Sequence, residues 1–329
     1  MYYPYLRGKQ AELGALKELA LDKKLSRKVI PVIEPIKLTA QLVKFMEVFC
    51  EDSRPFYLAM PPQVGMFNRQ LNVDYTIQEQ DTDAQKKSKK KMQKLKDGYL
   101  LARKDSNVRI ATFANVVSDR IVNQLIEEGK NNQCIILFRN EGELVTLYEK
   151  MSECKFVDQI YFVPQNNFEH ERDDKLVLFN DKFIVRRNNA EYVNYPDEFY
   201  SRDHLIYQKE GYVGFSDYSI VGEKYTEGGS QPKAHVLHIV YPMEPNQEFH
   251  IKHFCSDSNK DKQNQDKKFF EAARKVKKWN NMNPDMDTMG IQEIISNYDA
   301  GHYPGLTIEK KMSFMNHFEF VSRYLDGQT

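Results

Sequence analysis

The sequence predicts an α/β protein built as a (β/α)8 barrel, and two observations carry the prediction. About eight short apolar runs alternate with helical segments along the chain, which is typical of βα units around a parallel sheet. Several of these runs are apolar at consecutive positions, as expected for strands that are buried on both faces. Eight such units in about 250 residues are the usual content of a closed TIM-like barrel. An open doubly wound sheet is the alternative.

The composition is that of a globular protein, with 329 residues of which 41% are hydrophobic and 29% are charged. Lys and Arg total 47, as do Asp and Glu, so the net charge is zero and does not favour a nucleic-acid partner. No apolar run reaches the ~18 residues of a membrane span, and the opening MYYPYLRGKQ lacks the pattern of a signal peptide. The four cysteines are scattered as free thiols would be, so we expect a cytoplasmic protein without a membrane contact.

The first three βα units follow directly from the pattern of apolar residues. Residues 2–7 predict a short aromatic strand, and residues 10–21 place leucines at helical spacing. The second strand is the run VIPVIEPIK at 29–37, and Thr39 is a suitable N-cap for the helix after it. The third strand is FYLAMP at 56–61.

A polar stretch at 63–97 then interrupts the pattern and predicts an exposed, mostly helical insertion. It contains the lysine-rich run KKSKKK at 86–91. Such a run is usually a solvated helix face, and the alternative is a local contact with a polyanion. Strands four, five and six are predicted at GYLLARK, QCIILF and QIYFV, which occupy residues 98–104, 133–138 and 159–163.

The pattern changes after the sixth strand. Two apolar runs at 175–179 and 182–186 flank Asn180-Asp181, which predicts a β-hairpin. An aromatic loop follows the hairpin, and together they form a second insertion at 170–211. Long ordered loops of this kind are often functional.

The last two strands of the predicted barrel lie at 212–217 and 235–241. Helical spacing then continues towards the C-terminus, with the only Trp of the chain in the first of these helices. We therefore expect a barrel domain over 1–265, interrupted by the two insertions, with C-terminal helices over 266–329 packed on it.

Three separated motifs add a resemblance to this pattern. They are YYPYLRGKQAELGAL near the start, VIPVIEPIK in the second strand, and GFSDYSIVG with the later HVLHIVY. In this order, over roughly residues 2–255, the chain resembles a family of uncharacterised bacterial proteins related to the phage-type beta protein. The resemblance implies a TIM-barrel-like fold and a bacterial or prophage setting near mobile or defence genes. It implies no reaction and supplies no catalytic residues.

Active sites of such barrels lie at the C-terminal ends of the strands, where this chain places two acids. Glu34 follows the second strand, and Asp217 ends the seventh. Either carboxylate could act as a general base, or the two together could hold a divalent cation as cofactor. We therefore predict Glu34 and Asp217 as the catalytic residues. The residues predicted to bind an anionic substrate around the same rim are Arg7, Lys9, Arg139, Asn140, Tyr218 and His238. Gln165 is a further polar residue of the rim, after the sixth strand, and the Gly-rich loop at 228–230 could contact phosphate through backbone N–H groups or serve only as a flexible connection.

Each of these residues also has a structural interpretation. Arg7 and Glu34 could form an internal salt bridge, and His238 lies inside an apolar strand where a core histidine with one hydrogen bond is expected. The sequence contains neither G-x-S-x-G nor a P-loop motif, so serine hydrolase and P-loop chemistry are not indicated. The histidines and cysteines are not spaced like zinc ligands, and no metal ligands are assigned.

These observations leave three hypotheses about function. The first is a hydrolase that acts on a phosphate-containing or nucleic-acid substrate in conflict between bacteria and phage. The second is a non-catalytic recognition or scaffold protein that binds the product of a neighbouring gene. The third is a direct nucleic-acid binder that uses the lysine run and the aromatic loop at 192–207. The neutral net charge counts against the third.

Overall fold

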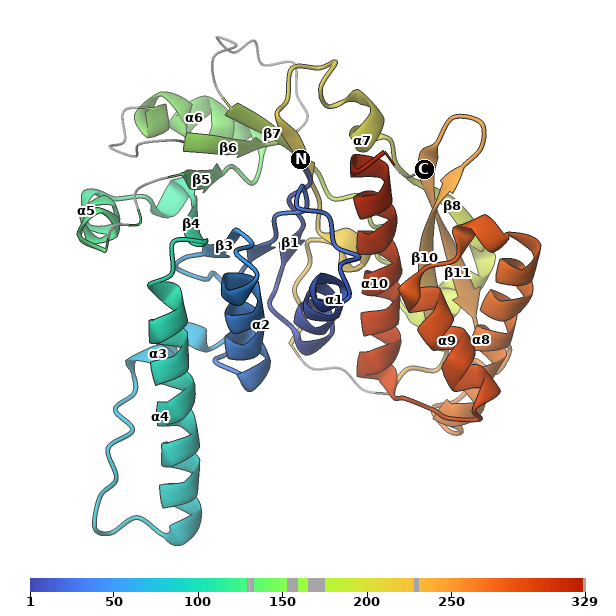
Figure 1. The fold of residues 1–329 in the computed structure, drawn as a ribbon, viewed down its shortest axis with the longest axis horizontal. Helices are drawn as coiled ribbons and strands as arrows, with labels where there is room; N and C mark the ends of the chain where they lie inside the picture. The colour runs from blue at the N-terminus through green and yellow to red at the C-terminus, as the bar shows by residue number, and fades with distance from the viewer. Residues whose placement is uncertain (129, 131–132, 153–158, 165–174, 228–230, 328–329) are drawn as a thin grey trace.

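Eight parallel strands form the barrel in a computed structural model that describes residues 1–128, 130, 133–152, 159–164, 175–227 and 231–327. Each strand pairs with its neighbours in chain order, and the strands are two to six residues long. Figure 1 shows them at the centre of the left part of the molecule. Their bounds are β1 (Tyr5–Leu6), β2 (Val32–Ile33), β3 (Phe56–Ala59), β4 (Val108–Phe113), β5 (Cys134–Leu137), β6 (Gln159–Val163), β7 (Lys175–Phe179) and β9 (Gly214–Ser216).

The barrel closes where β9 meets the start of the chain. The Phe215 amide donates to the Met1 carbonyl at 3.0 Å, and the Tyr3 amide donates to the Phe215 carbonyl at 2.9 Å. Tyr2 and Phe215 form a parallel bridge, and the Tyr5 amide reaches the Asp217 carbonyl at 2.9 Å. The predicted (β/α)8 barrel is therefore confirmed, and the open sheet is excluded.

The two faces of the strands carry different sets of buried side chains. The inward set fills the barrel with a cluster that contains Tyr5, Tyr57, Phe113, Phe162 and Phe179. The outward set packs against the surrounding helices, as expected for strands that are apolar on both faces. These helices are α1 (Gln10–Leu21), α2 (Ala40–Glu51), α5 (Asp119–Glu127) and α6 (Glu141–Ser152).

The polar insertion after β3 is helical, as predicted, and longer than expected. It contains α3 (Phe67–Asn72) and α4 (Asp83–Arg103), and α4 extends away from the barrel in Figure 1. The predicted strand at 98–104 is wrong, because these residues continue α4 and bury only Tyr99 fully. The fourth strand is β4, which follows the helix. A seven-residue apolar run does not by itself distinguish a strand from a helix end.

The predicted hairpin at 175–186 is also wrong. β7 pairs in parallel with both β6 and β9, so it is the seventh barrel strand, and residues 182–186 form no strand. The strand predicted as the seventh is therefore the eighth, β9. The predicted second insertion thus contains the seventh strand, and its remaining part, residues 180–211, lies between β7 and β9. From here on we use the name second insertion for residues 180–211.

The strand predicted as the eighth belongs to a separate antiparallel sheet. This sheet has the order β10–β11–β8, with β8 (Asp197–Ser201) contributed by the second insertion, β10 (Val236–Met243) and β11 (Glu248–Cys255). One of its faces packs on α8 (Gln265–Met282) and α9 (Met289–Asp299) in a cluster that includes Leu237, Phe269 and Ile291. The predicted boundary at residue 265 therefore separates the second sheet from α8 and α9, although the sheet and these helices share one hydrophobic cluster.

Helix α10 (Leu306–Leu325) joins the barrel to this second sheet. It lies between α1 and β10 in Figure 1, and it packs against both. Gly290 of α9 allows a close approach, because a Cβ atom there would lie 2.2 Å from the Met312 carbonyl oxygen of α10. Almost every residue from Lys311 to Ser322 is buried, so α10 is a core helix of the whole molecule.

Candidate active site at the mouth of the barrel

Glu34 lies at the C-terminal end of β2, and its side chain is fully buried in the mouth of the barrel. Its Oε2 accepts a hydrogen bond of 2.8 Å from the Tyr5 hydroxyl and forms an ion pair with the Arg7 guanidinium. Its Oε1 accepts the Gln63 amide at 2.5 Å. Both carboxylate oxygens are thus engaged, and the predicted alternative of an Arg7–Glu34 salt bridge is what the structure shows.

A cavity of about 410 Å³ lies on α4, and a different cavity of about 360 Å³ opens at the barrel mouth. We call the second one the mouth cavity. Three cations reach it: Arg7, Arg139 and Lys224. Its other lining residues are Gln63, Val64, Phe113, Tyr218, Glu223 and Tyr225. Of the predicted site, Arg7, Arg139 and Tyr218 therefore line one space.

The cations of the mouth cavity differ in how they are held. The Arg7 Nη2 donates to the Glu223 carbonyl at 2.8 Å, so Arg7 links the start of the chain to the loop after β9. Arg139 lies over the Phe113 ring at 5.4 Å and donates from Nε to Glu143 at 3.1 Å. Lys224 is exposed. Arg7 is therefore fixed by the fold, Arg139 is held by Glu143 but remains 34% exposed, and Lys224 is open to a ligand.

Lys9 and Asn140 lie at the edge of this region. The Lys9 ammonium lies 5.0 Å from the centre of the Tyr225 ring and 3.4 Å from the Thr226 carbonyl oxygen. Asn140 accepts the Glu143 amide at 2.9 Å through its Oδ1, near the start of α6. Lys9 thus adds positive charge beside the cavity, and Asn140 stabilises a helix end.

Tyr218 forms the inner wall of the mouth cavity. Its ring contacts Phe179 and Tyr5, with ring centres 4.9 and 5.4 Å apart, and the Arg7 guanidinium lies 5.7 Å from its centre. Burial raises the pKa of the Tyr218 phenol, and the nearby Glu223 carboxylate acts in the same direction. The hydroxyl is therefore protonated near neutral pH and can serve as a donor, not as a base.

Asp217 lies on the other face of the barrel wall. Its Oδ1 accepts hydrogen bonds from the Tyr2 hydroxyl at 2.6 Å and the Ser219 amide at 2.8 Å. Its Oδ2 accepts the Tyr200 hydroxyl at 3.1 Å. Burial raises the pKa of this carboxyl, and the three hydrogen bonds oppose the shift.

The expectation that Asp217 meets Glu34 across the mouth is therefore wrong. Successive side chains of a strand point to opposite faces, and Tyr218 belongs to the cluster that fills the barrel. Asp217, one residue earlier, points outward to Tyr2 and to the second insertion. Among the described residues, the two predicted acids share no hydrogen-bond partner.

His238 is not on the barrel rim, because β10 belongs to the second sheet. Its Nδ1 lies 2.7 Å from the Nδ1 of His253, its partner across the strands. Burial lowers the pKa of both rings, with His253 at about 4. The pair packs against Phe183 and Tyr192. His238 is therefore a packed histidine with one hydrogen bond, which is the structural interpretation offered above, and not a residue of the ligand site.

Lys224, Tyr225 and Gln63 were missed by sequence reasoning. Lys224 and Tyr225 lie in the polar loop after β9, and Gln63 follows the third strand in the same way. Their only signal is their place just beyond strands whose C-terminal ends meet at one rim. Two other predicted rim features, Gln165 and the loop at 228–230, lie outside the described residues.

The described parts of the chain contain no group of three His, Cys, Asp or Glu side chains placed to hold a metal ion. No helix among them is long and apolar enough to cross a membrane. No known protein family, curated protein or solved structure matches this chain. The barrel and its mouth cavity are therefore the observations on which a function can be argued.

Proposed function

We propose that the mouth cavity binds a small phosphate-bearing ligand. The observation that carries the proposal is the convergence of Arg7, Arg139 and Lys224 on one space at the C-terminal end of the barrel strands. This is the end at which barrels of this kind bind their ligands. A volume of about 360 Å³ is within the range of small-molecule sites and is adequate for a mononucleotide.

The chemistry of the lining residues favours phosphate. Arg presents a planar set of donors that matches phosphate oxygens, and Lys adds a point charge. Tyr225 offers a ring beside these cations, against which an apolar or aromatic part of the ligand can pack. The buried Tyr218 hydroxyl is available as a further donor at the cavity wall.

Hydrolysis of a phosphoester is the finer form of this proposal. Glu223 is the acid that lines the cavity, and Glu34 lies behind Arg7, where Arg7, Tyr5 and Gln63 occupy both of its oxygens. A ligand phosphate that attracts the Arg7 guanidinium would weaken this ion pair and free the Oε2 atom of Glu34. Asp217 takes no part, since its side chain lies on the outer face of the wall. Binding is therefore better supported than catalysis.

Isothermal titration calorimetry with inorganic phosphate and with adenosine monophosphate tests the binding proposal. We expect Arg139→Gln/Lys224→Gln to weaken binding by about 10-fold or more, because two charge-assisted contacts are lost. The matched control is Arg27→Gln/Lys44→Gln, which removes two exposed cations far from the mouth cavity. Equal affinity of the mouth variant and the control, or no binding of either probe, would contradict the proposal.

A scaffold function is the second candidate, and one feature favours it. Five apolar side chains of the second insertion are each at least 42% exposed: Ile184, Val185, Val193, Tyr195 and Phe199. An exposed apolar set on an inserted segment is typical of a protein contact. Copurification with the product of an adjacent gene, lost in Ile184→Asp/Phe199→Asp, would support this function over ligand binding.

We also propose that the protein acts in conflict between a bacterium and its phages, the setting that its motifs imply. Phage plaque counts on cells that express the wild type or Arg139→Gln/Lys224→Gln would test this. Protection by the wild type alone would connect the setting to the mouth cavity. Equal counts with and without the protein, over a panel of phages, would contradict it.

A further inference from the structure

The zero net charge of this protein conceals a strong separation of charge. Residues 83–104, which contain α4, carry nine Lys and Arg and only two acidic residues, Asp83 and Asp97. The rest of the chain therefore has a matching excess of negative charge. Because α4 projects away from the barrel in Figure 1, its positive charge is displayed on an arm. We call α4 and the extended residues 73–82 beside it the basic arm.

Six of the seven lysines of α4 fall into two groups with different environments. Lys89 pairs with Asp81 at 2.7 Å, and Lys96 donates to the Val73 carbonyl at 3.1 Å, so both hold the extended segment against the helix. Lys87, Lys90, Lys91 and Lys94 are exposed, and none has a described hydrogen-bond or ion-pair partner. The second group is therefore not needed to hold the arm together.

These four lysines form one face of the helix, because they are spaced i, i+3, i+4 and i+7. They extend over about 10 Å of the helix axis at the usual rise per residue. Like charges at this spacing repel one another and weaken the helix. The helix nevertheless begins in a capping box, in which Thr82 accepts the Gln85 amide and Gln85 accepts the Thr82 amide.

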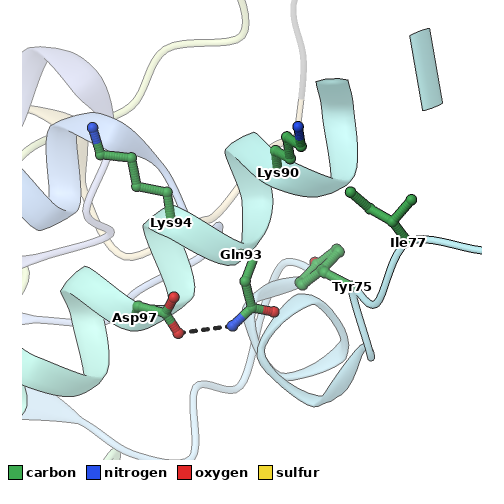
Figure 2. A pocket seen from close by; sticks show the side chains of 6 residues that line it. All are labelled: Tyr75, Ile77, Lys90, Gln93, Lys94 and Asp97. Atoms are coloured by element: carbon green, nitrogen blue, oxygen red, sulfur yellow. Dashed lines mark hydrogen bonds between the residues drawn. The ribbon is translucent and has the colours of Figure 1, made fainter. Parts of the chain in front are cut away.

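A pocket of about 410 Å³ lies beside this face and is drawn in Figure 2. Lys90, Gln93, Lys94 and Asp97 of α4 line one side, and Tyr75 and Ile77 of the extended segment line the other. The Tyr75 hydroxyl donates to the Gln70 carbonyl at 2.9 Å, which fixes the ring. In Figure 2 Gln93 is joined to Asp97 by a hydrogen bond of 2.7 Å, so polar groups face the aromatic ring.

We propose that the basic arm binds single-stranded nucleic acid. The four exposed lysines would contact successive phosphates, and an unpaired base would stack on Tyr75, as in other binders that combine cations with an aromatic platform. The Asp97 carboxylate repels a phosphate but accepts hydrogen bonds from the amino group of a base. The pocket is therefore suited to the base and the lysine face to the backbone.

An anionic membrane is the other polyanion that such a face could meet, and the arm fits it less well. A helix that binds a membrane surface inserts an apolar face beside its cations. The apolar side of α4, with Met92, Leu95 and Tyr99, is packed on the core. The exposed Leu100 and Leu101 lie in the last turn of α4, at the opposite end from its capping box.

Fluorescence anisotropy with labelled 20-nucleotide DNA and RNA single strands tests the proposal on the full chain. We expect the logarithm of the binding constant to fall with the logarithm of salt concentration with a slope of about −3, for four phosphate contacts. Lys87→Gln/Lys90→Gln/Lys91→Gln/Lys94→Gln should lose nearly all of this dependence. The matched control, Lys24→Gln/Lys209→Gln/Lys233→Gln/Lys278→Gln, removes four exposed lysines elsewhere and should retain it.

Tyr75 separates stacking from charge. We expect Tyr75→Ala to weaken binding by about 10-fold and Tyr75→Phe to bind like the wild type, because the ring is retained. Thermal unfolding of the quadruple lysine variant should match the wild type or exceed it, since like charges are removed. Arg139→Gln/Lys224→Gln should leave strand binding unchanged, so failure of this proposal and failure of the mouth cavity can be distinguished.

Three results would overturn the inference. The first is that the wild type, at 50 mM salt and up to about millimolar protein, binds neither DNA nor RNA single strands more tightly than the quadruple variant does. The second is equal loss in the quadruple variant and in the matched control. The third is a quadruple variant that loses the wild type's binding to vesicles of anionic phospholipid but binds the oligonucleotides as the wild type does. This result would make the arm a membrane contact.

Discussion

Arg7 and Glu34 form a buried ion pair that spans the first two strands of the barrel at its mouth. The Glu34 side chain is fully buried, and that of Arg7 is 13% exposed. The pair therefore has two consequences: it holds the rim together, and it sets how much of the Glu34 charge is available to a ligand.

Glu34→Gln should reduce the free energy of unfolding by about 3 kcal/mol, because it leaves the Arg7 guanidinium without its buried counter-charge. Urea unfolding followed by circular dichroism measures this loss. Glu47→Gln is the control, because its pair with Lys44 is exposed and should contribute within about 0.5 kcal/mol. Unchanged stability of Glu34→Gln together with loss of an activity would identify Glu34 as a catalytic base instead.

His317 joins α10 to the barrel, and its Nδ1 lies 2.8 Å from the Ser219 hydroxyl oxygen. Burial lowers the pKa of His317 from 6.5 to about 3. Since the folded pKa lies below the unfolded one, the stability that this group contributes is fully present above pH 6.5 and is lost as pH falls towards 3. The unfolded chain takes up the proton first.

His317→Gln should therefore flatten the acid limb of the stability curve. Between pH 6 and pH 4 the free energy of unfolding of the wild type should fall by about 1.4 kcal/mol per pH unit more than that of the variant. This is the slope expected when the unfolded state binds one more proton than the folded state. Urea unfolding at unit pH intervals measures the difference. Burial also lowers the pKa of His204 and of His253, to about 4 each. Both residues are present in the wild type and in the variant, so their contributions cancel in the difference between the two curves. Parallel curves for the two proteins would contradict the assignment.

Gly214 marks the seam where the barrel closes. A Cβ atom at this position would lie 2.7 Å from Tyr3 Cε2 and 2.9 Å from the Met1 carbonyl oxygen. Gly214→Ala should therefore push β9 from the start of the chain and lower the free energy of unfolding by about 1–3 kcal/mol. Gly14→Ala is the control, because its nearest neighbour would be Lys311 Cδ at 3.5 Å, and a helical Gly→Ala change is favourable. Equal stability of the two variants would mean that the seam tolerates a methyl group.

The barrel was predictable because most of its strands are apolar on both faces and alternate with helices, and this pattern can be read without knowing which strands pair.

The strands that were predicted wrongly lie where local patterns fit more than one structure. GYLLARK continues α4, and its apolar residues are too few to reveal their period. Asn180-Asp181 resembles a hairpin turn, but β7 gains two long-range parallel partners that no local pattern shows.

The candidate site divides in the same way. Arg7, Glu34, Arg139 and Tyr218 gather at the mouth because residues that follow parallel strands meet at one edge, which chain order alone implies. Chain order does not show whether the Asp217 side chain points into the barrel or outward, because a shift of one residue along a strand moves a side chain to the opposite face of the sheet.

The sequence by itself determined the repeated strand–helix order, the lysine run and the place of Arg7, Glu34, Arg139 and Tyr218 at the rim, since these depend on local composition, period and chain order. Only the tertiary structure decided which strands close the barrel, that β10 leaves it, and that Glu34 is neutralised by Arg7. Those outcomes depend on contacts between residues far apart in the chain. Their energies come from burial and from pairing across strands, which the order of residues does not display.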